Sequence, residues 1–187
     1  MTRISGWRPR LSLRSALCAA TGLALATASV AHIGSNLADE LRPDFPRAEI
    51  SLVNSLGTVL ADESLIKQVW VNLIGNALKF TSQSATPKIL ISREDKKNIA
   101  TFSIMDNGVG FEEERASELF TVFKRLHSSD DFPGSGVGLA IVKRIIASHG
   151  GDIEAHGNPG VGSQFIFQLP HPNTVGEHSS AAGSDAE

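Results

Sequence analysis

The sequence predicts an α+β fold in which helices cover one face of a mixed β-sheet. Two stretches of helical periodicity, residues 63–80 and 137–151, alternate along the chain with pairs of short strand-like runs. The 187 residues are 41% hydrophobic, which is enough for one compact core with additional segments at the ends. We therefore expect one domain, which begins near Arg47.

Six short runs predict the strands, because each is apolar or alternating and is bounded by turn residues. They are residues 48–54, 57–61, 88–94, 98–106, 152–157 and 163–170. Asp62 is a suitable N-cap for the first helix, and the glycine pair at 150–151 is typical of the C-terminus of the last. A shorter helical pattern covers residues 112–124.

The two ends of the chain differ from this domain in composition. Residues 1–40 combine early arginines with an uncharged stretch from Ser15 to Ala38, which is either an export or anchor signal or a poorly structured leader. The stretch is rich in Ala, Ser, Thr and Gly, so its insertion in a bilayer would gain little free energy. Residues 171–187 are small, polar and aperiodic and are expected to be a disordered tail.

The overall charge and the cysteine content exclude several classes of function. The 17 basic and 20 acidic residues give a net charge of -3, and no basic stripe follows the first arginines, so nucleic acid is not an expected partner. Cys18 has no second thiol with which to form a disulfide or a metal site. We expect a cytoplasmic protein, and its membrane association through residues 1–40 stays open.

The stretch VWVNLIGNALKF, residues 69–80, places two amides on an otherwise apolar helix. At about 100° per residue, Asn72, Asn76 and Lys79 fall on one narrow stripe, with Phe80 at its edge. Asparagine is a mediocre helix former, so folding alone does not explain two of them there. The stripe either faces solvent, as polar stripes on helices commonly do, or belongs to a binding site.

The segment DNGVGF is a first candidate for the rest of such a site. Asp106 ends a strand, and Gly108 and Gly110 remove two side chains beside it. A flat ligand could approach this backbone, and the carboxylate could accept a hydrogen bond from the exocyclic amine of adenine. The alternative is an ordinary Asn-Gly turn.

The segment PGSGVGLAIVKRII is a second candidate. Gly134, Gly136 and Gly138 lead into a helix whose first N–H groups can hold phosphate oxygens. The spacing matches neither a Walker loop nor a Rossmann fingerprint, so we expect a phosphate site of another kind.

Together and in this order, these segments resemble the ATP-binding catalytic domain of sensor histidine kinases, a branch of the GHKL ATPases. NLIGNALKF is similar to the asparagine box of that family, DNGVGF to its first glycine box, LFTVFKRLH to its phenylalanine box, GSGVGLAIVKRIIASHGG to its second glycine box and GVGSQFIFQLP to its closing one. The lid segment looks most like that of phytochrome-related kinases. The resemblance covers residues 41–170 and implies the Bergerat fold, a two-layer α/β sandwich with a mixed, mostly antiparallel sheet.

The resemblance implies a role for each motif residue in binding ATP and Mg²⁺. Asn76 would ligate the metal, and Asn72 would stand where related GHKL ATPases place their hydrolytic glutamate. Lys79 and Arg125 would neutralise phosphate charge, so that Asn72, Lys79 and Arg125 form the catalytic set. Phe80 would border the adenine.

The same resemblance assigns further residues to the nucleotide. Asp106 would bind the adenine amine, and HSSDDFP would be the mobile part of a lid over the phosphates. The remaining residues of the implied nucleotide site are Gly108, Gly110, Gly134, Gly136, Gly138, Leu139 and Ser163.

Members of this family carry a two-helix dimerisation segment with a phosphoacceptor histidine, and no histidine of this chain stands in such a context. We therefore expect transfer to a histidine on a separate dimerisation domain, with a response regulator as the next partner. The alternative is a nucleotide-binding regulatory module, resembling anti-sigma factors or pseudokinases, that transfers no phosphate. A hydrolysing GHKL ATPase is disfavoured, because Asn72 is not a glutamate.

Overall fold

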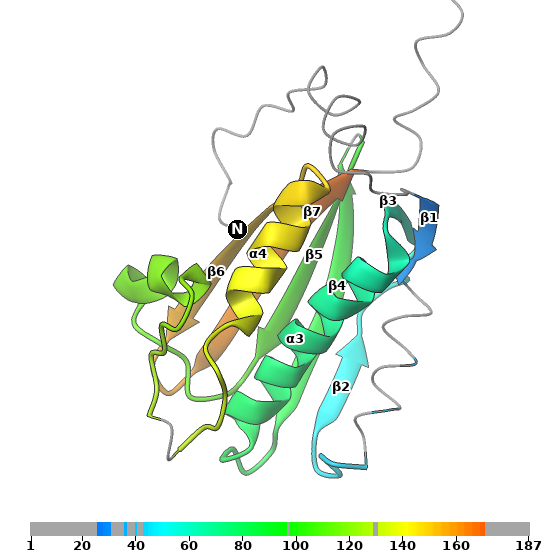
Figure 1. Cartoon of the computed structure of the whole chain (residues 1–187). Coiled ribbons are helices and arrows are strands. Elements are labelled where there is room, and N and C mark those ends of the chain that lie inside the picture. Colours follow the sequence, from blue (N-terminus) through cyan, green and yellow to red (C-terminus); the bar gives the residue numbers. More distant parts are fainter. Residues whose placement is uncertain are drawn as a thin grey trace, which may run out of the picture.

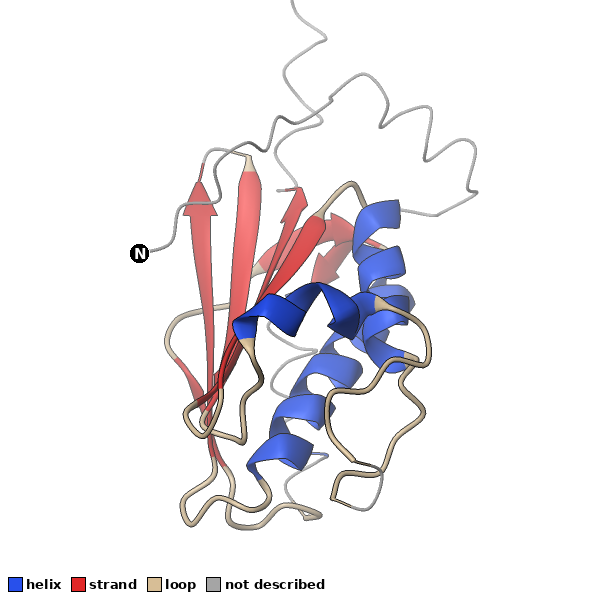
Figure 2. Cartoon of the chain, turned by 90° about the vertical axis from the view of Figure 1, so that its left-hand side faces the viewer, coloured by secondary structure: helices blue, strands red, loops and turns tan. Residues whose placement is uncertain are grey.

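The fold is a two-layer sandwich in which helices cover one face of a five-stranded sheet (Figures 1 and 2). The computed structural model describes residues 26–30, 36, 40, 43–96, 98–128 and 131–170. Its elements, in chain order, are β1 (Ala26–Ser29), β2 (Glu49–Leu52), β3 (Thr58–Ala61), α3 (Glu63–Thr81), β4 (Lys88–Lys96), β5 (Ile99–Asp106), the 3₁₀ helix η1 (Glu113–Phe120), α4 (Gly138–Ser148), β6 (Asp152–Asn158) and β7 (Gly162–Pro170).

The main sheet has the order β2-β4-β5-β7-β6. The β2–β4 pair is parallel, and the other three pairs are antiparallel. Buried and exposed residues alternate along β4 and β5, as expected for strands with one face on the core. The predicted α+β class and the mixed, mostly antiparallel sheet are confirmed.

The strand β3 does not join the main sheet. The sequence predicted this strand but did not show that it belongs to a separate sheet. It pairs instead with β1, antiparallel, with Ala26 opposite Ala61. Ala28 and Val30 are buried in the core, so the packed domain extends N-terminal of residue 41, into the segment expected to be a leader. Composition concealed this strand because its residues are small and weakly hydrophobic.

The rest of the expected leader and the expected tail at 171–187 lie outside the described residues. Within the described part, no helix is both long enough and apolar enough to cross a membrane.

Three aromatic rings form the centre of the core between α3 and the sheet. Trp70 contacts Phe102 and Phe167 edge-on, with ring centroids 5.6 and 5.4 Å apart, and the two phenylalanines stack on each other at 4.9 Å. All three side chains are fully buried. Such aromatic pairs add stabilisation beyond the area they bury, so this cluster fixes α3 on strands β5 and β7.

The predicted boundaries of the first helix, residues 63–80, agree with those of α3 to within one residue. Asp62 caps its N-terminus by accepting a hydrogen bond from the Leu65 N–H at 3.0 Å, as predicted. The Asp62 N–H in turn donates to Nε2 of His149 at 3.0 Å, and Nδ1 of that ring lies 2.8 Å from the Ile145 carbonyl. Because a carbonyl only accepts, the proton is on Nδ1. His149 therefore links the start of α3 to the end of α4.

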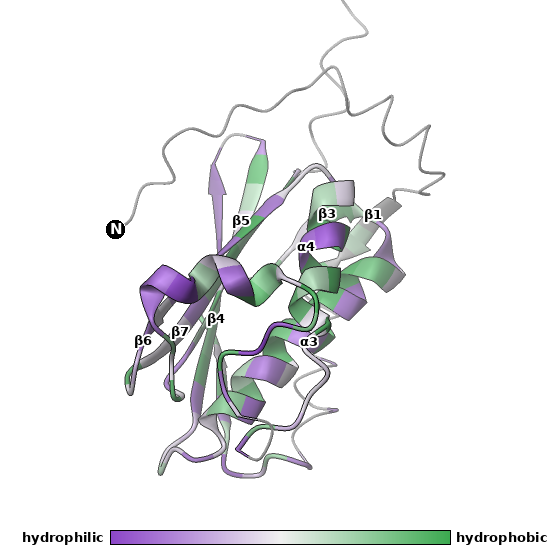
Figure 3. Ribbon diagram, turned by 60° about the vertical axis from the view of Figure 1, so that its left-hand side comes forward, coloured by the Kyte–Doolittle hydropathy of each residue, from purple (hydrophilic) through white to green (hydrophobic). Residues whose placement is uncertain are grey.

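The helix predicted over residues 112–124 is wrong in type and length. The segment forms the shorter 3₁₀ helix η1, none of whose residues is fully buried and whose N-cap makes no side-chain hydrogen bond. Thr121 is extended and Phe123 has a positive φ, so the helix cannot continue. Figure 3 shows η1 passing from a hydrophilic to a hydrophobic end.

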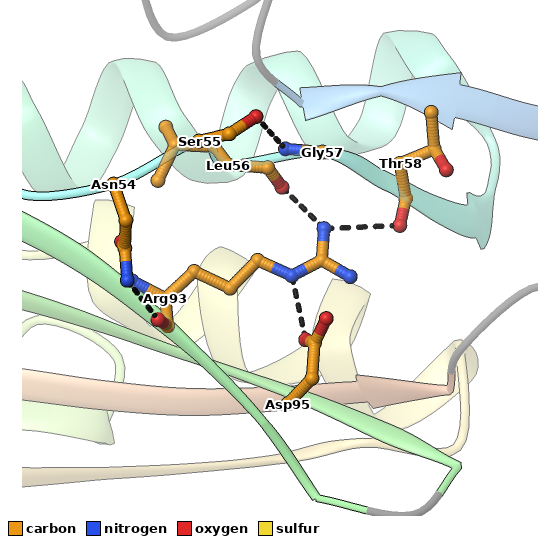
Figure 4. A network of polar contacts seen from close by, with 7 residues as sticks. All are labelled: Asn54, Ser55, Leu56, Gly57, Thr58, Arg93 and Asp95. Carbon is orange, nitrogen blue, oxygen red and sulfur yellow. Dashed lines mark hydrogen bonds and ion pairs between the residues drawn. The ribbon is translucent and has the colours of Figure 1, made fainter.

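A buried arginine joins the small sheet to the main one (Figure 4). The Arg93 guanidinium donates to the carbonyls of Leu56 and Thr58, and its Nε donates to Asp95 at 2.6 Å. The Asn54 amide accepts from the Arg93 N–H and donates to the Arg93 carbonyl. These bonds satisfy a charge whose side chain is 6% exposed, and an unpaired buried charge would be costly.

Replacement of Trp70 by alanine should destabilise the fold by about 3–5 kcal/mol, because it removes the ring that contacts both sheet phenylalanines. Urea unfolding followed by circular dichroism measures the loss. Val71→Ala, a change at the neighbouring, partly exposed position, is the control and should cost less than about 1 kcal/mol. Equal losses in the two variants would show that α3 does not depend on this cluster.

Candidate functional site

A cavity of about 260 Å³ lies beside the C-terminal half of α3. Its other walls are the turn after β5, the segment between η1 and α4, the first turn of α4 and the start of β7. All but two of the predicted site residues line it. These are Asn72, Asn76, Lys79, Phe80, Gly110, Arg125, Gly134, Gly136, Gly138, Leu139 and Ser163.

The amide stripe of α3 faces this cavity, so it does not lie on the outer, fully exposed side of the helix. Asn72, Asn76 and Lys79 are all half-buried. The Asn72 amide donates to the Gln68 carbonyl at 2.8 Å. Its Oδ1 lies against α4, since a Cβ on Gly138 would come within 2.3 Å of that oxygen. Glycine at 138 therefore allows α4 to begin directly beside the stripe.

Positive charge collects in the cavity. Lys79, Lys124 and Arg125 line it, and no carboxylate is among its described lining residues. Burial lowers the pKa of Lys79, and the nearby Arg125 charge lowers it further. An anion placed between Lys79 and Arg125 would relieve both their repulsion and the desolvation of Lys79.

The N-terminus of α4 adds a further partial positive charge beside these cations. The helix begins at Gly138, its N-cap Val137 makes no side-chain hydrogen bond, and its first turn contains no acidic residue. The first N–H groups of a helix have no partner within it and carry the positive end of its dipole. With Gly136 and Gly138 both lining the cavity, this helix end is suited to phosphate oxygens.

The other end of the cavity is aromatic. The ring of Phe80 lies 5.4 Å from that of His127 and 5.0 Å from that of Phe132. Nε2 of His127 lies 2.9 Å from the Gly110 carbonyl and therefore carries a proton. Such a wall suits a flat, aromatic ligand.

Sequence reasoning missed several residues of this wall. Phe132 belongs to the segment expected to be a mobile lid, yet its side chain is buried and its carbonyl accepts from Arg125 at 2.7 Å. The sequence clue to the burial of Phe132 was that it is the one Phe, Tyr or Trp in a polar loop. The further lining residues that were not predicted are Phe111, Leu119, Lys124, Leu126, His127, Ser135 and Phe165.

The two predicted residues that do not line the cavity are Asp106 and Gly108, and each adjoins a residue that does, Ser163 and Phe80 respectively. The Asp106 carboxylate is buried, accepting from the Ser163 hydroxyl and from the Gly108 N–H at 2.8 Å. Burial raises its pKa, and these hydrogen bonds oppose the rise in part. Ser163, whose hydroxyl holds this carboxylate, does line the cavity.

The glycines of the turn are required by the protein's own backbone. A Cβ on Gly108 would come within 2.5 Å of the Phe80 carbonyl oxygen, and one on Gly110 within 2.1 Å of the Asn158 oxygen. Gly110 also has a φ of 64°. Close packing of three chain segments therefore requires these glycines, and the approach of a ligand to their backbone stays a prediction.

An ionic clamp holds η1 on β6 at the edge of the site. Glu113 accepts from the Gly157 N–H and contacts Nδ1 of His156, both at 2.8 Å. Nε2 of the same ring lies 3.4 Å from Glu154. The hydrogen bond to Glu113 raises the pKa of His156, and the Gly157 N–H lowers the pKa of Glu113. The clamp therefore fixes the start of the segment that reaches the cavity.

Comparison with known proteins gives the class of this site. A profile of the histidine kinase-, DNA gyrase B- and HSP90-like ATPases matches residues 61–173, and the chain belongs to this family. It therefore contains the ATP-binding catalytic domain found in histidine kinases.

Individual relatives agree with this assignment. The chain is 41% identical to the phytochrome-like protein Cph1 of Synechocystis sp. over 126 residues, which are 67% of this chain and 17% of that protein. It is similar to full-length ShkA in complex with AMPPNP (TM-score 0.67, 27% identity, 84% of this chain and 34% of that one). It is also similar to the catalytic domain of ThkA (TM-score 0.66, 27% identity, 78% and 95%). The chain thus spans a small part of the curated relative.

The stability supplied by the Glu113–His156 clamp should depend on pH. The pKa of His156 is raised above its usual 6.5, so its contribution is complete below about that pH and is lost as pH rises through the raised pKa. The pKa of Glu113 is lowered below its usual 4.5, so its contribution is complete above that pH and is lost as pH falls. Glu113→Gln should therefore cost most near pH 5.5, on the order of 0.5–1 kcal/mol for partly exposed groups.

Urea titrations of Glu113→Gln and the wild type at pH 5.5 and pH 9 measure this difference. Glu114→Gln, at the exposed neighbouring carboxylate, is the control and should show no such dependence. A cost for Glu113→Gln that is the same at both pH values would show that the ion pair contributes nothing.

Proposed function

We propose that this domain binds Mg²⁺-ATP in the cavity and transfers the terminal phosphoryl group to a histidine on a separate dimerisation domain. The observation that carries the proposal is the division of the cavity into two ends. Lys79 and Arg125, with no carboxylate among the described lining residues, suit a polyphosphate, and the rings at the other end suit a purine.

The amides account for transfer to histidine in preference to hydrolysis. The lone pair of a neutral imidazole nitrogen attacks the terminal phosphorus, the bond from phosphorus to the bridging oxygen breaks, and ADP leaves with that electron pair. The attacking nitrogen needs no base. Asn72 offers no carboxylate to activate water, while Lys79 and Arg125 stabilise the charge that develops on the phosphate oxygens.

The donor set of the cavity fits a magnesium ion that arrives with the nucleotide. No group of three or more His, Cys, Asp or Glu side chains in the described part of the chain could hold a metal alone. Mg²⁺ commonly takes one or two protein oxygens and completes its shell with phosphates and water. Asn76 lines the cavity and would supply one such oxygen, and the bound metal would neutralise the phosphate chain.

Asp106 is proposed to bind the adenine amine from behind the cavity wall, through its carboxylate or through Ser163, which it holds. A response regulator is proposed as the later partner, since a structure of ThkA was determined in complex with the response regulator TrrA. A domain that uses ATP is expected on the cytoplasmic side of the membrane.

Isothermal titration with a nonhydrolysable ATP analogue tests the binding step. Wild-type protein should bind the analogue, and added Mg²⁺ should tighten binding. Asn76→Ala should lose most of the affinity that Mg²⁺ adds, roughly tenfold, because the metal loses its protein oxygen. Gln68→Ala, at an exposed amide on the same helix, should bind as the wild type does. An absence of binding at millimolar analogue would contradict the proposal.

A second candidate function, a nucleotide-binding regulatory module, is motivated by the lack of a recognisable phosphoacceptor histidine. Incubation with γ-labelled ATP and isolated histidine-bearing dimerisation domains separates the two. We expect an acid-labile phosphoprotein that is absent with Asn76→Ala. Nucleotide binding without any such product, across a panel of acceptor domains, would favour the regulatory module.

A further inference from the structure

The N-terminus of α3 receives one of its hydrogen bonds from α4. The backbone N–H of an N-cap residue is often satisfied within its own helix, by a Glu or Gln side chain at the third helical position. That position is Leu65 here, which has no side-chain acceptor. The Asp62 N–H donates instead to Nε2 of His149, which lies 87 positions further along the chain. A bond between two helices thus replaces one that a polar residue 65 would make within α3.

The His149 ring is fixed on α4. The residue is 4% exposed, and its Nδ1–H donates to the Ile145 carbonyl at 2.8 Å. The end of α4 is in turn packed on β7, because a Cβ on Gly151 would come within 1.9 Å of the Gln168 carbonyl oxygen. Since the ring is buried and bonded to its own helix, the position of Nε2 defines where the end of α4 lies beside α3.

The same two helices meet again at the start of α4, where a Cβ on Gly138 would come within 2.3 Å of Asn72 Oδ1. At 1.5 Å per residue, Asp62 and Asn72 are about 15 Å apart along α3. Gly138 and His149 are about 16 Å apart along α4. Because the two spacings match, α4 runs antiparallel to the first half of α3 between these two contacts (Figure 1).

The two contacts differ in how firmly they hold the helices. The one between Asn72 and Gly138 is close packing, which tolerates a small slide along the helix axis. The hydrogen bond from Asp62 to His149 is directional and does not. A slide of α4 by the rise of one residue, about 1.5 Å, is half the length of a hydrogen bond. It would displace the first N–H groups of α4 from Asn76 and Lys79, which line the same end of the cavity.

The aromatic end of the cavity is built on other elements. Phe80 belongs to α3, and Ser163 belongs to β7. The His127 ring is held by the Gly110 carbonyl, in the turn after β5. A slide of α4 would therefore weaken contacts to phosphate oxygens and leave contacts to a purine in place. The two parts of a nucleotide thus report separately on the position of α4.

We propose that His149 is a positioning residue for the phosphate chain of the nucleotide. Its hydrogen bond with Asp62 sets the axial position of α4 against α3, and so the distance from the N-terminus of α4 to Asn76 and Lys79. This inference rests on the proposed binding of Mg²⁺-ATP. His149 does not line the cavity, and it lies at the end of α4 opposite to the one that does. It therefore acts through the placement of a helix and not through contact with the ligand.

The sharpest test compares His149→Asn with His149→Gln by isothermal titration. The Asn amide can bond within α4 but is too short to reach Asp62, whereas the Gln amide reaches as far as Nε2 and can accept from the Asp62 N–H. His149→Asn should bind the nonhydrolysable ATP analogue with Mg²⁺ about tenfold more weakly than the wild type, the effect of losing one hydrogen bond to phosphate. Its affinity for adenosine, which has no phosphate, should be unchanged. His149→Gln should recover most of the affinity for the analogue.

Two further variants separate positioning from a general loss of stability. Ser148→Ala removes a hydroxyl that donates within α4 beside the ring, and it should change neither affinity. Leu65→Gln, added to His149→Asn, supplies the Asp62 N–H with a partner inside α3 and does not rebuild the link to α4. The affinity of this double variant for the analogue should stay low.

Three results would overturn the positioning role. They are an unchanged affinity for the analogue in His149→Asn, an equal fall in its affinity for adenosine, and recovery of the analogue affinity on adding Leu65→Gln. Should His149→Asn fail to fold, His149→Leu, which fills the buried space without an acceptor, repeats the comparison with adenosine. Wild-type protein that binds no analogue would instead refute the proposed function itself, so the two failures are distinguishable.

Discussion

The packing of Trp70 between Phe102 and Phe167 is the constraint on which the site depends. It fixes the rotation of α3 about its own axis. At about 100° per residue, Asn72 and Lys79 lie roughly 200° and 180° around the helix from Trp70. Once the tryptophan is buried on the sheet, these side chains have to point away from it. The core therefore orients the binding stripe, and a change in core packing would reach the cavity through the rotation of one helix.

Close approach of backbone segments supplies the second constraint. The Val109 N–H donates to the Phe80 carbonyl. A Cβ on Gly162 would come within 2.0 Å of the backbone carbonyl oxygen of Asp106. The end of α3, the end of β5 and the start of β7 are thus held together without intervening side chains. Since Phe80, Asp106 and Ser163 stand on these three segments, their relative positions follow from glycine packing. Backbone packing within the fold therefore positions the aromatic end of the cavity.

The sequence predicted features that are local, and it failed where the cause is tertiary. Periodicity predicted α3 and α4, and the amides on one stripe predicted the side of α3 that lines the cavity. The strand β1 was not predicted, because small residues reveal burial only when a partner strand is known. The burial of Phe132 was equally hidden, since it depends on rings from α3 and from the segment after η1.

The choice of amides over carboxylates on the stripe follows from the charges around them. Burial lowers the pKa of Lys79, and the charge of Arg125 lowers it further, so the two cations disfavour each other in the free protein. A glutamate in place of Asn72 would relieve that repulsion and would then compete with phosphate for the same cations. It would also stand ready to activate water. Under the proposed function, an amide at position 72 adds no acid that competes for Lys79, so part of the electrostatic cost of the empty site would be recovered when a phosphate chain binds, without an added route to hydrolysis.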